Sequence, residues 1–182
     1  GGAGVEDFIN NKFIKSKIIF TNGKIIQRPE VADHALGLIL SFTRNLYPIS
    51  QNISLSKIDR PIEIRNKKIL IIGLGGIGVN TAERLKAFGA KIDAISNDLI
   101  PLVSFIDKLY LSDNLNNIAK NYDIIICAAP LTKKTKYMLD YNFFKQMKKN
   151  SIFINVSRGK IVKTKDLLKN KIYKKFRGIG LD

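Results

Sequence analysis

The sequence has very few of the residues that build disulfides or metal sites. Among its 182 residues it holds one cysteine, Cys127, and one histidine, His34. One cysteine cannot form an intramolecular disulfide, and the pair cannot supply the three ligands of a catalytic zinc site unless carboxylates take over. We therefore expect no metal. Cys127 lies inside an apolar run and is interpreted as a core residue, and His34 lies in an apolar helix, which favours a packed or interfacial histidine.

Long hydrophobic runs are also missing. No stretch of 18 or more apolar residues occurs, and residues 1–10 lack the basic region and long apolar stretch of a signal peptide. These absences argue against a membrane partner and predict a cytoplasmic protein. The hydrophobic content of 45% is still enough for the core of one ordinary domain.

Acidic residues are few as well. The chain has 31 Lys and Arg against 15 Asp and Glu, a formal net charge of +16. A basic surface can bind nucleic acid, a membrane or a small anion. The lysines are spread along the chain, mostly at the ends of expected elements, with no aromatic stacking platform between them. This pattern predicts no nucleic-acid partner and favours a small anionic substrate.

The chain does contain a repeated alternation of short β-branched runs and helical stretches. The runs expected as strands cover residues 68–72, 91–95, 108–111, 123–128, 151–156 and 177–181. Such alternation predicts an α/β domain in which helices cover both faces of a parallel sheet. Gly89 is expected to end the helix between the first two strands, and three later helices have candidate caps: Asp113 for 114–120, Asp140 for 141–148 and Thr164 for 165–170.

A helix with little polar surface precedes the first strand. It is expected over residues 29–46, and its apolar character predicts burial between domains or subunits. Residues 47–66 are expected to form a surface connection into the sheet. Residues 17–20 form a short strand-like run in a segment too small for a domain, and Asp182 directly follows a strand. We therefore expect a fragment that is truncated at both ends.

The strongest motif is an apolar strand followed by G-x-G-x-x-G and a helix. Gly73 permits the tight turn, Gly75 lets the backbone approach a pyrophosphate, and Gly78 lets the helix pack on the strand. In this context the motif predicts a Rossmann-type, doubly wound dinucleotide-binding fold. The lack of a Gly-Lys-Ser/Thr sequence argues against a P-loop.

The residue at the end of the second strand selects between NAD and NADP. A carboxylate there binds a ribose 2′-hydroxyl and repels a 2′-phosphate. The stretch reads Ser96-Asn97-Asp98, and no arginine adjoins it. Asp98 as the ribose ligand predicts NAD, with NADP less favoured; Asp98 as an ordinary loop acid, with Ser96 at the strand end, stays open.

Several short stretches together resemble one family, the D-isomer-specific 2-hydroxyacid dehydrogenases. Five match in order: Gly2-Ala3-Gly4-Val5, Val31-Ala32-Asp33-His34-Ala35-Leu36, residues 73–78, Pro130-Leu131-Thr132 with Thr135, and Asn155-Val156-Ser157-Arg158-Gly159 leading to Gly180-Leu181-Asp182. The resemblance implies that residues 1–22 are a remnant of the substrate domain. It also implies that residues 23–182 are a dinucleotide-binding domain, incomplete at its C-terminus.

The resemblance assigns roles to individual residues. Arg158 would be the catalytic arginine that binds the substrate carboxylate and polarises the neighbouring carbonyl, a role that suits its fork of donors at a strand's carboxyl end. Pro130 would line the cofactor site, and Asp182 would receive the nicotinamide amide. The other residues expected around the cofactor are Gly73, Gly75, Gly76, Ile77, Gly78, Asn97, Asp98, Ala129, Thr135, Val156 and Ser157.

The activity implied is hydride transfer between NAD(H) and a small 2-hydroxy or 2-keto acid. The family's catalytic glutamate and histidine would lie beyond Asp182, so the full-length protein is expected to be an enzyme and the 182-residue chain alone inactive. A homodimer formed through the helix at 31–46 is also implied. The alternatives are a non-catalytic NAD-binding regulatory or corepressor-type module on the same fold and, disfavoured by Arg158-Gly159 and the Pro130 loop, a methyltransferase.

Overall fold

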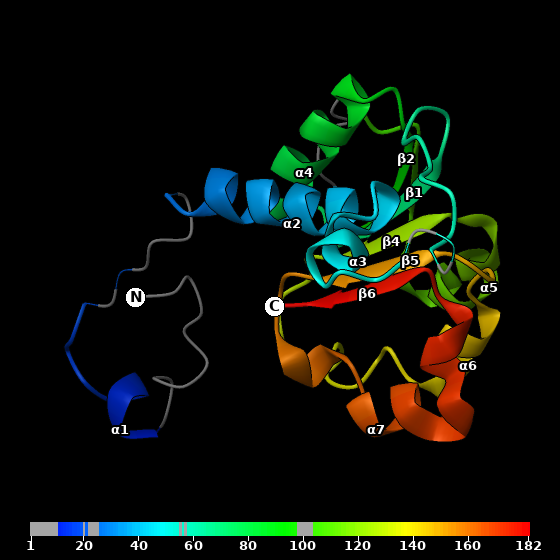
Figure 1. Cartoon of the computed structure of the whole chain (residues 1–182). Coiled ribbons are helices and arrows are strands. Elements are labelled where there is room, and N and C mark those ends of the chain that lie inside the picture. The colour runs from blue at the N-terminus through cyan, green and yellow to red at the C-terminus, as the bar shows by residue number, and fades with distance from the viewer. Residues whose placement is uncertain (1–10, 20, 22–25, 55, 57, 98–103) are drawn as a thin grey trace.

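A computed structural model describes every residue of the chain except 1–10, 20, 22–25, 55, 57 and 98–103. Its centre is a six-stranded sheet in the order β3-β2-β1-β4-β5-β6, and every neighbouring pair is parallel (Figure 1). The strands are β1 (Lys68–Ile72), β2 (Lys91–Ile95), β3 (Lys108–Tyr110), β4 (Ile124–Cys127), β5 (Ile152–Asn155) and β6 (Gly178–Leu181). All six predicted strands are present, with four of them one or two residues shorter than expected, and the doubly wound α/β fold is confirmed.

Alternate residues of the buried strands face two separate cores. Ile69 and Ile71 of β1 belong to one apolar cluster, and Leu70 and Ile72 belong to the other. This is the period-2 alternation of a strand that is covered on both faces. The first core lies under α2 (Arg28–Thr43) and α4 (Gly76–Ala87), and the second lies under α5 (Leu115–Ile118), α6 (Tyr141–Gln146) and α7 (Thr164–Leu168).

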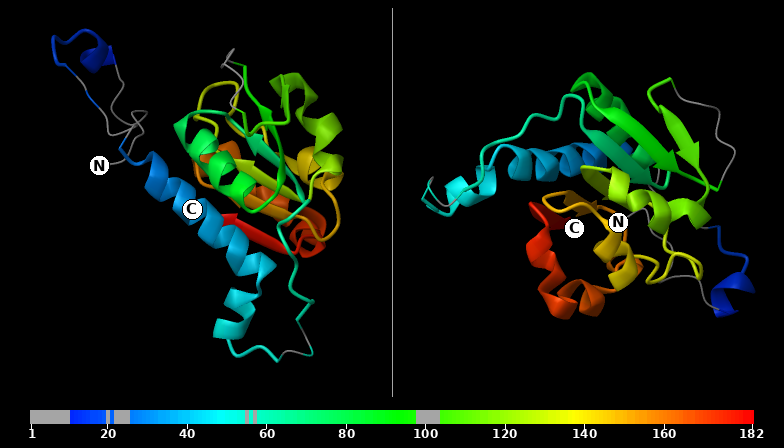
Figure 2. Two further views of the ribbon diagram at one scale, coloured as in Figure 1. Left: turned by 90° about the horizontal axis from the view of Figure 1, so that it is seen from above. Right: turned by 90° about the vertical axis from the view of Figure 1, so that its right-hand side faces the viewer.

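The figures show the same layering. In Figure 1, α2 and α4 lie on one side of the sheet, and α6 and α7 lie on the other. Figure 2 shows from two further directions that α2 and α4 share a side. The remaining helical segments are α1 (Asn11–Ile14), α3 (Leu46–Ser50) and short 3₁₀ turns at Ser112–Asn114, Ala119–Asn121, Gly159–Ile161 and Lys169–Lys175.

The apolar helix ends earlier than its sequence predicts. α2 stops at Thr43, and Asn45 adopts a left-handed conformation with φ 59° before α3 begins. Ala32, Ala35 and Ile39 are fully buried, so one face of α2 packs on the sheet of its own domain. The apolar residues of this face are therefore buried within the domain, and a contact of the helix with another domain or subunit stays a prediction. The segment expected as a plain connection contains α3.

Only one of the three predicted helix caps forms. The Asp140 carboxylate accepts a hydrogen bond from the Phe143 N–H at the start of α6, which confirms that cap. Asp113 instead lies inside the 3₁₀ turn that precedes α5, and Thr164 is the first helical residue of α7 behind the N-cap Lys163. In both cases the helical turn already includes the expected cap residue, so its side chain is not at the N-cap position from which it could accept hydrogen bonds from the first free N–H groups.

The segment before α2 differs from its sequence interpretation where it is described. Residues 17–19 are not in a strand, so the strand-like run is wrong there, while Phe20 and the Gly2-Ala3-Gly4-Val5 stretch lie outside the described residues. Within the described ranges, no helix has both the length and the apolar character that a membrane span requires.

Candidate functional site

The carboxyl ends of the six parallel strands meet along one edge of the sheet. The register aligns Ile72 with Ile95 and Cys127, and Asn155 with Cys127 and Leu181. The residues that follow these positions therefore form one rim, which is where open α/β sheets bind their ligands. A cavity of about 880 Å³ lies at this rim, a volume in the range of sites for small molecules and cofactors.

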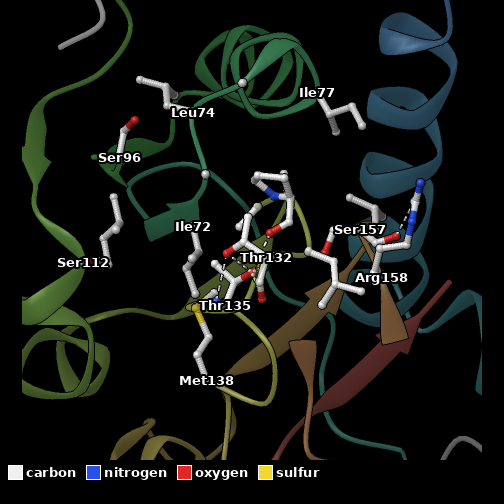
Figure 3. Close-up of a pocket in the computed structure, with 18 of the residues that line it drawn as sticks. Ile72, Leu74, Ile77, Ser96, Ser112, Thr132, Thr135, Met138, Ser157 and Arg158 are labelled. Atoms are coloured by element: carbon white, nitrogen blue, oxygen red, sulfur yellow. Dashed lines mark hydrogen bonds between the residues drawn. The ribbon is translucent and has the colours of Figure 1, made fainter. Parts of the chain in front are cut away.

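Nearly all the residues predicted for the cofactor line this cavity. They are Gly73, Gly75, Gly76, Ile77, Asn97, Ala129, Pro130, Thr135, Val156, Ser157, Arg158 and Asp182. The exceptions are Gly78, which is buried behind the turn, and Asp98, which lies outside the described residues. Figure 3 shows Ser157 and Arg158 at one end of the cavity, beside α2, and Ser96 and Ser112 at the other end.

The three motif glycines meet three different steric demands. Gly73 has φ +95°, and a Cβ atom there would lie 2.6 Å from the backbone of Ala129. At Gly78 a Cβ atom would overlap the carbonyl oxygen of Gly73, so only glycine lets α4 approach β1 this closely. Gly75, the N-cap of α4, has open space where its Cβ would be. The turn thus leaves the N-terminus of α4 accessible to a phosphate, as a bound dinucleotide requires.

The turn after β5 is built around the buried side chain of Asn155. Its Oδ1 atom accepts hydrogen bonds from the Ser157 N–H at 3.2 Å and the Ser157 hydroxyl at 2.8 Å, and its Nδ2 atom donates to the Arg158 carbonyl at 3.2 Å. The Arg158 guanidinium in turn donates to the Ser157 carbonyl at 3.0 Å. Asn155 therefore fixes the backbone from which Arg158 extends along the cavity wall.

Cys127 lies below this turn and is fully buried. Burial raises the pKa of its thiol, and a hydrogen bond with the Ser157 hydroxyl at 3.5 Å only partly offsets that effect. A buried thiol with a raised pKa is a poor nucleophile. The interpretation of Cys127 as a core residue is confirmed.

The loop after β4 is fixed by its own threonines. Thr135 Oγ1 donates to the Pro130 carbonyl at 2.6 Å and accepts from the Thr132 N–H at 2.7 Å. In return, Thr132 Oγ1 accepts from the Thr135 N–H at 3.1 Å. These bonds, drawn in Figure 3, hold the loop as a wall of the cavity.

His34, expected as a packed or interfacial histidine, is not packed in this structure. Its side chain is 50% exposed, and its Nε2 atom lies 3.7 Å from a carboxylate oxygen of Asp182. The packed alternative is wrong, because His34 and Asp33 form an exposed part of α2 between the buried Ala32 and Ala35, whereas an interfacial position for His34 stays a prediction. The contact places the chain's one histidine next to a cavity residue.

Several lining residues were not expected from the sequence. Gln27, Arg28 and Val31 reach the cavity from the start of α2, and Lys133 and Lys134 reach it from the loop after β4. The two lysines follow the Pro130-Leu131-Thr132 stretch directly, so that motif could have indicated them. Val31 opens one of the five matching stretches, but no local pattern marks Gln27 and Arg28, because they approach the glycine turn only through the packing of α2 against α4.

The described residues suit a dinucleotide better than a metal ion. Among them, no group of three or more His, Cys, Asp or Glu side chains is placed to hold a cation. The cavity instead combines an accessible helix N-terminus, apolar walls and the basic side chains of Arg28, Lys133, Lys134 and Arg158. These are the features that bind an anionic cofactor.

Known proteins resemble the chain over most of its length. D-3-phosphoglycerate dehydrogenase from Methanocaldococcus jannaschii is 30% identical over 185 residues, an alignment that covers 100% of this chain and 35% of that protein. The NAD-dependent formate dehydrogenase from Staphylococcus aureus in complex with NAD superposes with a TM-score of 0.74 at 26% identity, covering 88% of this chain and 48% of that one. An acyclic imino acid reductase, Bsp5, in complex with NADPH and D-Arg gives a TM-score of 0.72 at 28% identity, with coverage of 86% and 51%.

The chain thus spans about half, or less, of the length of these relatives. A family model described as the NAD-binding domain of D-isomer specific 2-hydroxyacid dehydrogenases matches residues 36–182. That range contains the glycine turn, the Pro130 loop, Arg158 and Asp182, all of which line the cavity. The chain belongs to the D-isomer specific 2-hydroxyacid dehydrogenase family, and residues 36–182 correspond to that family's NAD-binding domain.

Proposed function

We propose that residues 23–182 are the coenzyme domain of an NAD-dependent oxidoreductase that interconverts small 2-hydroxy and 2-keto acids, and that residues 1–22 belong to its substrate domain. The observation that carries this proposal is that the glycine turn and Arg158 line the same cavity at the carboxyl edge of the sheet. The same cavity then offers a site for the phosphates of the cofactor and a site for the carboxylate of the substrate, at the edge of the sheet where open α/β folds bind their ligands.

The chain's own residues have separable tasks in this reaction. NADH, when bound, supplies the hydride to carbon 2 of the keto acid. Arg158 would bind the substrate carboxylate and the adjacent carbonyl oxygen, and its fixed positive charge would stabilise the negative charge that develops on that oxygen. Asn155 would position Arg158 through the turn that it holds. Asp182, at the end of β6, would accept a hydrogen bond from the nicotinamide amide.

The choice of cofactor follows from the far end of the cavity. Ser96 and Asn97 line it there, and Asp98 is the next residue along the chain. A carboxylate at the end of β2 would repel the 2′-phosphate of NADPH, whereas Lys133 and Lys134 and the net charge of +16 would attract it. We propose that the local carboxylate dominates, so that NADH binds more tightly than NADPH.

Calorimetric titration of the chain with NADH, NADPH and S-adenosylmethionine tests this function. NADH is expected to bind, NADPH to bind more weakly, and S-adenosylmethionine not to bind. If S-adenosylmethionine binds and NADH does not, the dehydrogenase assignment is wrong and a methyltransferase is favoured. NADPH affinity equal to or above that of NADH would mean that Ser96 and Asn97, rather than Asp98, determine the preference.

A further inference from the structure

The first residue of α2 lies over the glycine turn. A Cβ atom built on Gly76, the first residue of α4, would overlap the Nε and Cδ atoms of Arg28. The Arg28 side chain therefore occupies the space that a side chain at position 76 would fill. Arg28 also lines the cavity, together with Gly75, Gly76 and Ile77. A guanidinium group from a distant part of the sequence is thereby brought to the N-terminus of the helix that faces the cofactor.

The start of α2 is held in this place by contacts with α4. Arg84 of α4 bonds through Nε to the Asp33 carboxylate at 2.5 Å, and its NH2 group donates to the Pro29 carbonyl at 3.5 Å. Arg84 is only 25% exposed in this pair. Since Pro29 directly follows Arg28, these bonds fix the backbone from which the Arg28 side chain extends.

The N-terminus of α4, against which Arg28 packs, favours an anion. The first turn of α4 contains no acidic residue, and its free N–H groups add the partial positive charge of a helix N-terminus. Because Gly75 and Gly76 have no side chains, neither residue blocks the approach of a ligand to those N–H groups. An arginine at this point can donate to phosphate oxygens through two or more N–H groups at once.

We propose that Arg28 binds the diphosphate of the dinucleotide cofactor, opposite the N–H groups of α4, and that Gly76 is glycine because the guanidinium needs its space. This inference rests on the proposed function, because it takes the cavity to hold a dinucleotide. The inference adds a cofactor ligand that comes from α2, outside the strand-and-turn motif. It also explains why position 76, between Gly75 and Gly78, is a glycine.

Binding measurements on Arg28→Gln test the proposal. Loss of a charge-assisted hydrogen bond should weaken NADH and ADP-ribose at least about tenfold and should flatten the salt dependence of their affinity. Adenosine, which lacks the diphosphate, should bind both proteins equally. Arg65→Gln removes an exposed arginine outside the cavity and should leave every affinity unchanged. Thermal unfolding of both variants checks that the fold is intact.

Two further variants test the spatial argument. Gly76→Ala, at a helical position where alanine is the better helix former, should keep or raise the melting temperature yet weaken NADH, because the new methyl group displaces Arg28. Arg28→Ala combined with Gly76→Arg should recover part of the NADH affinity that Arg28→Ala alone loses, since it returns a guanidinium to the same space.

The outcomes separate this inference from the proposed function. If the unmodified chain binds NADH and Arg28→Gln binds it equally well at low and high salt, Arg28 is not a diphosphate ligand and the dehydrogenase assignment still stands. Weakened adenosine binding that matches the loss for NADH would also overturn the inference, because the effect would not depend on the diphosphate. Failure of the unmodified chain to bind NADH would instead refute the proposed function.

Discussion

Single polar residues connect elements that are far apart along the chain, and Asp123 is a clear example. Its carboxylate accepts hydrogen bonds from the Lys68 N–H and from Lys148 Nζ, each at 2.9 Å, so it joins the beginnings of β1 and β4 to the segment that follows α6. Partial burial raises the pKa of the Asp123 carboxyl, but the bonds from Lys148 and Lys68 outweigh that effect and lower it below the ordinary value. The ionised carboxylate therefore stabilises the folded chain.

Replacing Asp123 should destabilise the fold in a pH-dependent manner. Asp123→Asn removes a carboxylate whose folded pKa is lowered, so its contribution is present above the unfolded pKa, about 3.9, and is lost as the pH falls through the folded value. We expect a loss of about 1–3 kcal/mol in the free energy of unfolding at neutral pH. Urea unfolding should show this difference shrinking below about pH 4. A difference in the free energy of unfolding that stays constant in acid would contradict this prediction. Glu83→Gln, at an exposed position, serves as the control.

At the scale of elements, the sequence predicted strands better than helix ends. Runs such as 69–72 are uniformly apolar because both faces of the sheet are covered, and this signal is local. The starts of the helical turns near Asp113 and Thr164 were misplaced, because short 3₁₀ and single-turn helices obtain their stability from packing rather than from a cap. The cavity residues that follow strands were likewise predictable, whereas Arg28 was not, since it meets Gly76 only through tertiary packing.

The difference between a formed and an unformed cap can be measured. Asp140→Ala should lower the free energy of unfolding by about 1 kcal/mol, because the Phe143 N–H loses its acceptor at the start of α6. Asp113→Ala is the matched control: its side chain caps no helix, so the change should be within about 0.5 kcal/mol. Chemical denaturation of both variants provides the comparison. Equal losses would show that the Asp140 bond adds nothing beyond the general effect of removing an acid.

For the whole molecule, the notable surface feature is a group of exposed apolar side chains on and just after α3. Leu46, Tyr47, Ile49 and Ile53 are 54%, 57%, 51% and 42% exposed. They continue from the apolar helix α2, for which the sequence predicts a dimer contact. Apolar residues gathered on one exposed element favour a self-complementary interface in a homodimer.

We expect the unmodified chain to be a dimer and the double variant Leu46→Glu with Ile49→Glu to be a monomer, because two buried charges on each side of a two-fold interface would repel each other. Light scattering after size-exclusion chromatography measures both states. Leu111→Glu, at a similarly exposed leucine away from α3, should remain a dimer. A monomeric unmodified chain would rule out this interface.

The 182-residue chain is further expected to bind cofactor without turning over substrate. Reduction of a 2-keto acid needs a proton donor near the forming alkoxide, with a pKa close to the working pH. Arg158 cannot serve, because its guanidinium stays protonated and can only orient or polarise. His34 contacts Asp182, the residue proposed for the nicotinamide amide, but does not itself line the cavity that Arg158 lines. NADH oxidation with glyoxylate, hydroxypyruvate or pyruvate should therefore match the buffer rate, while NADH binding persists. Sustained turnover that His34→Ala abolishes would make His34 the acid–base group.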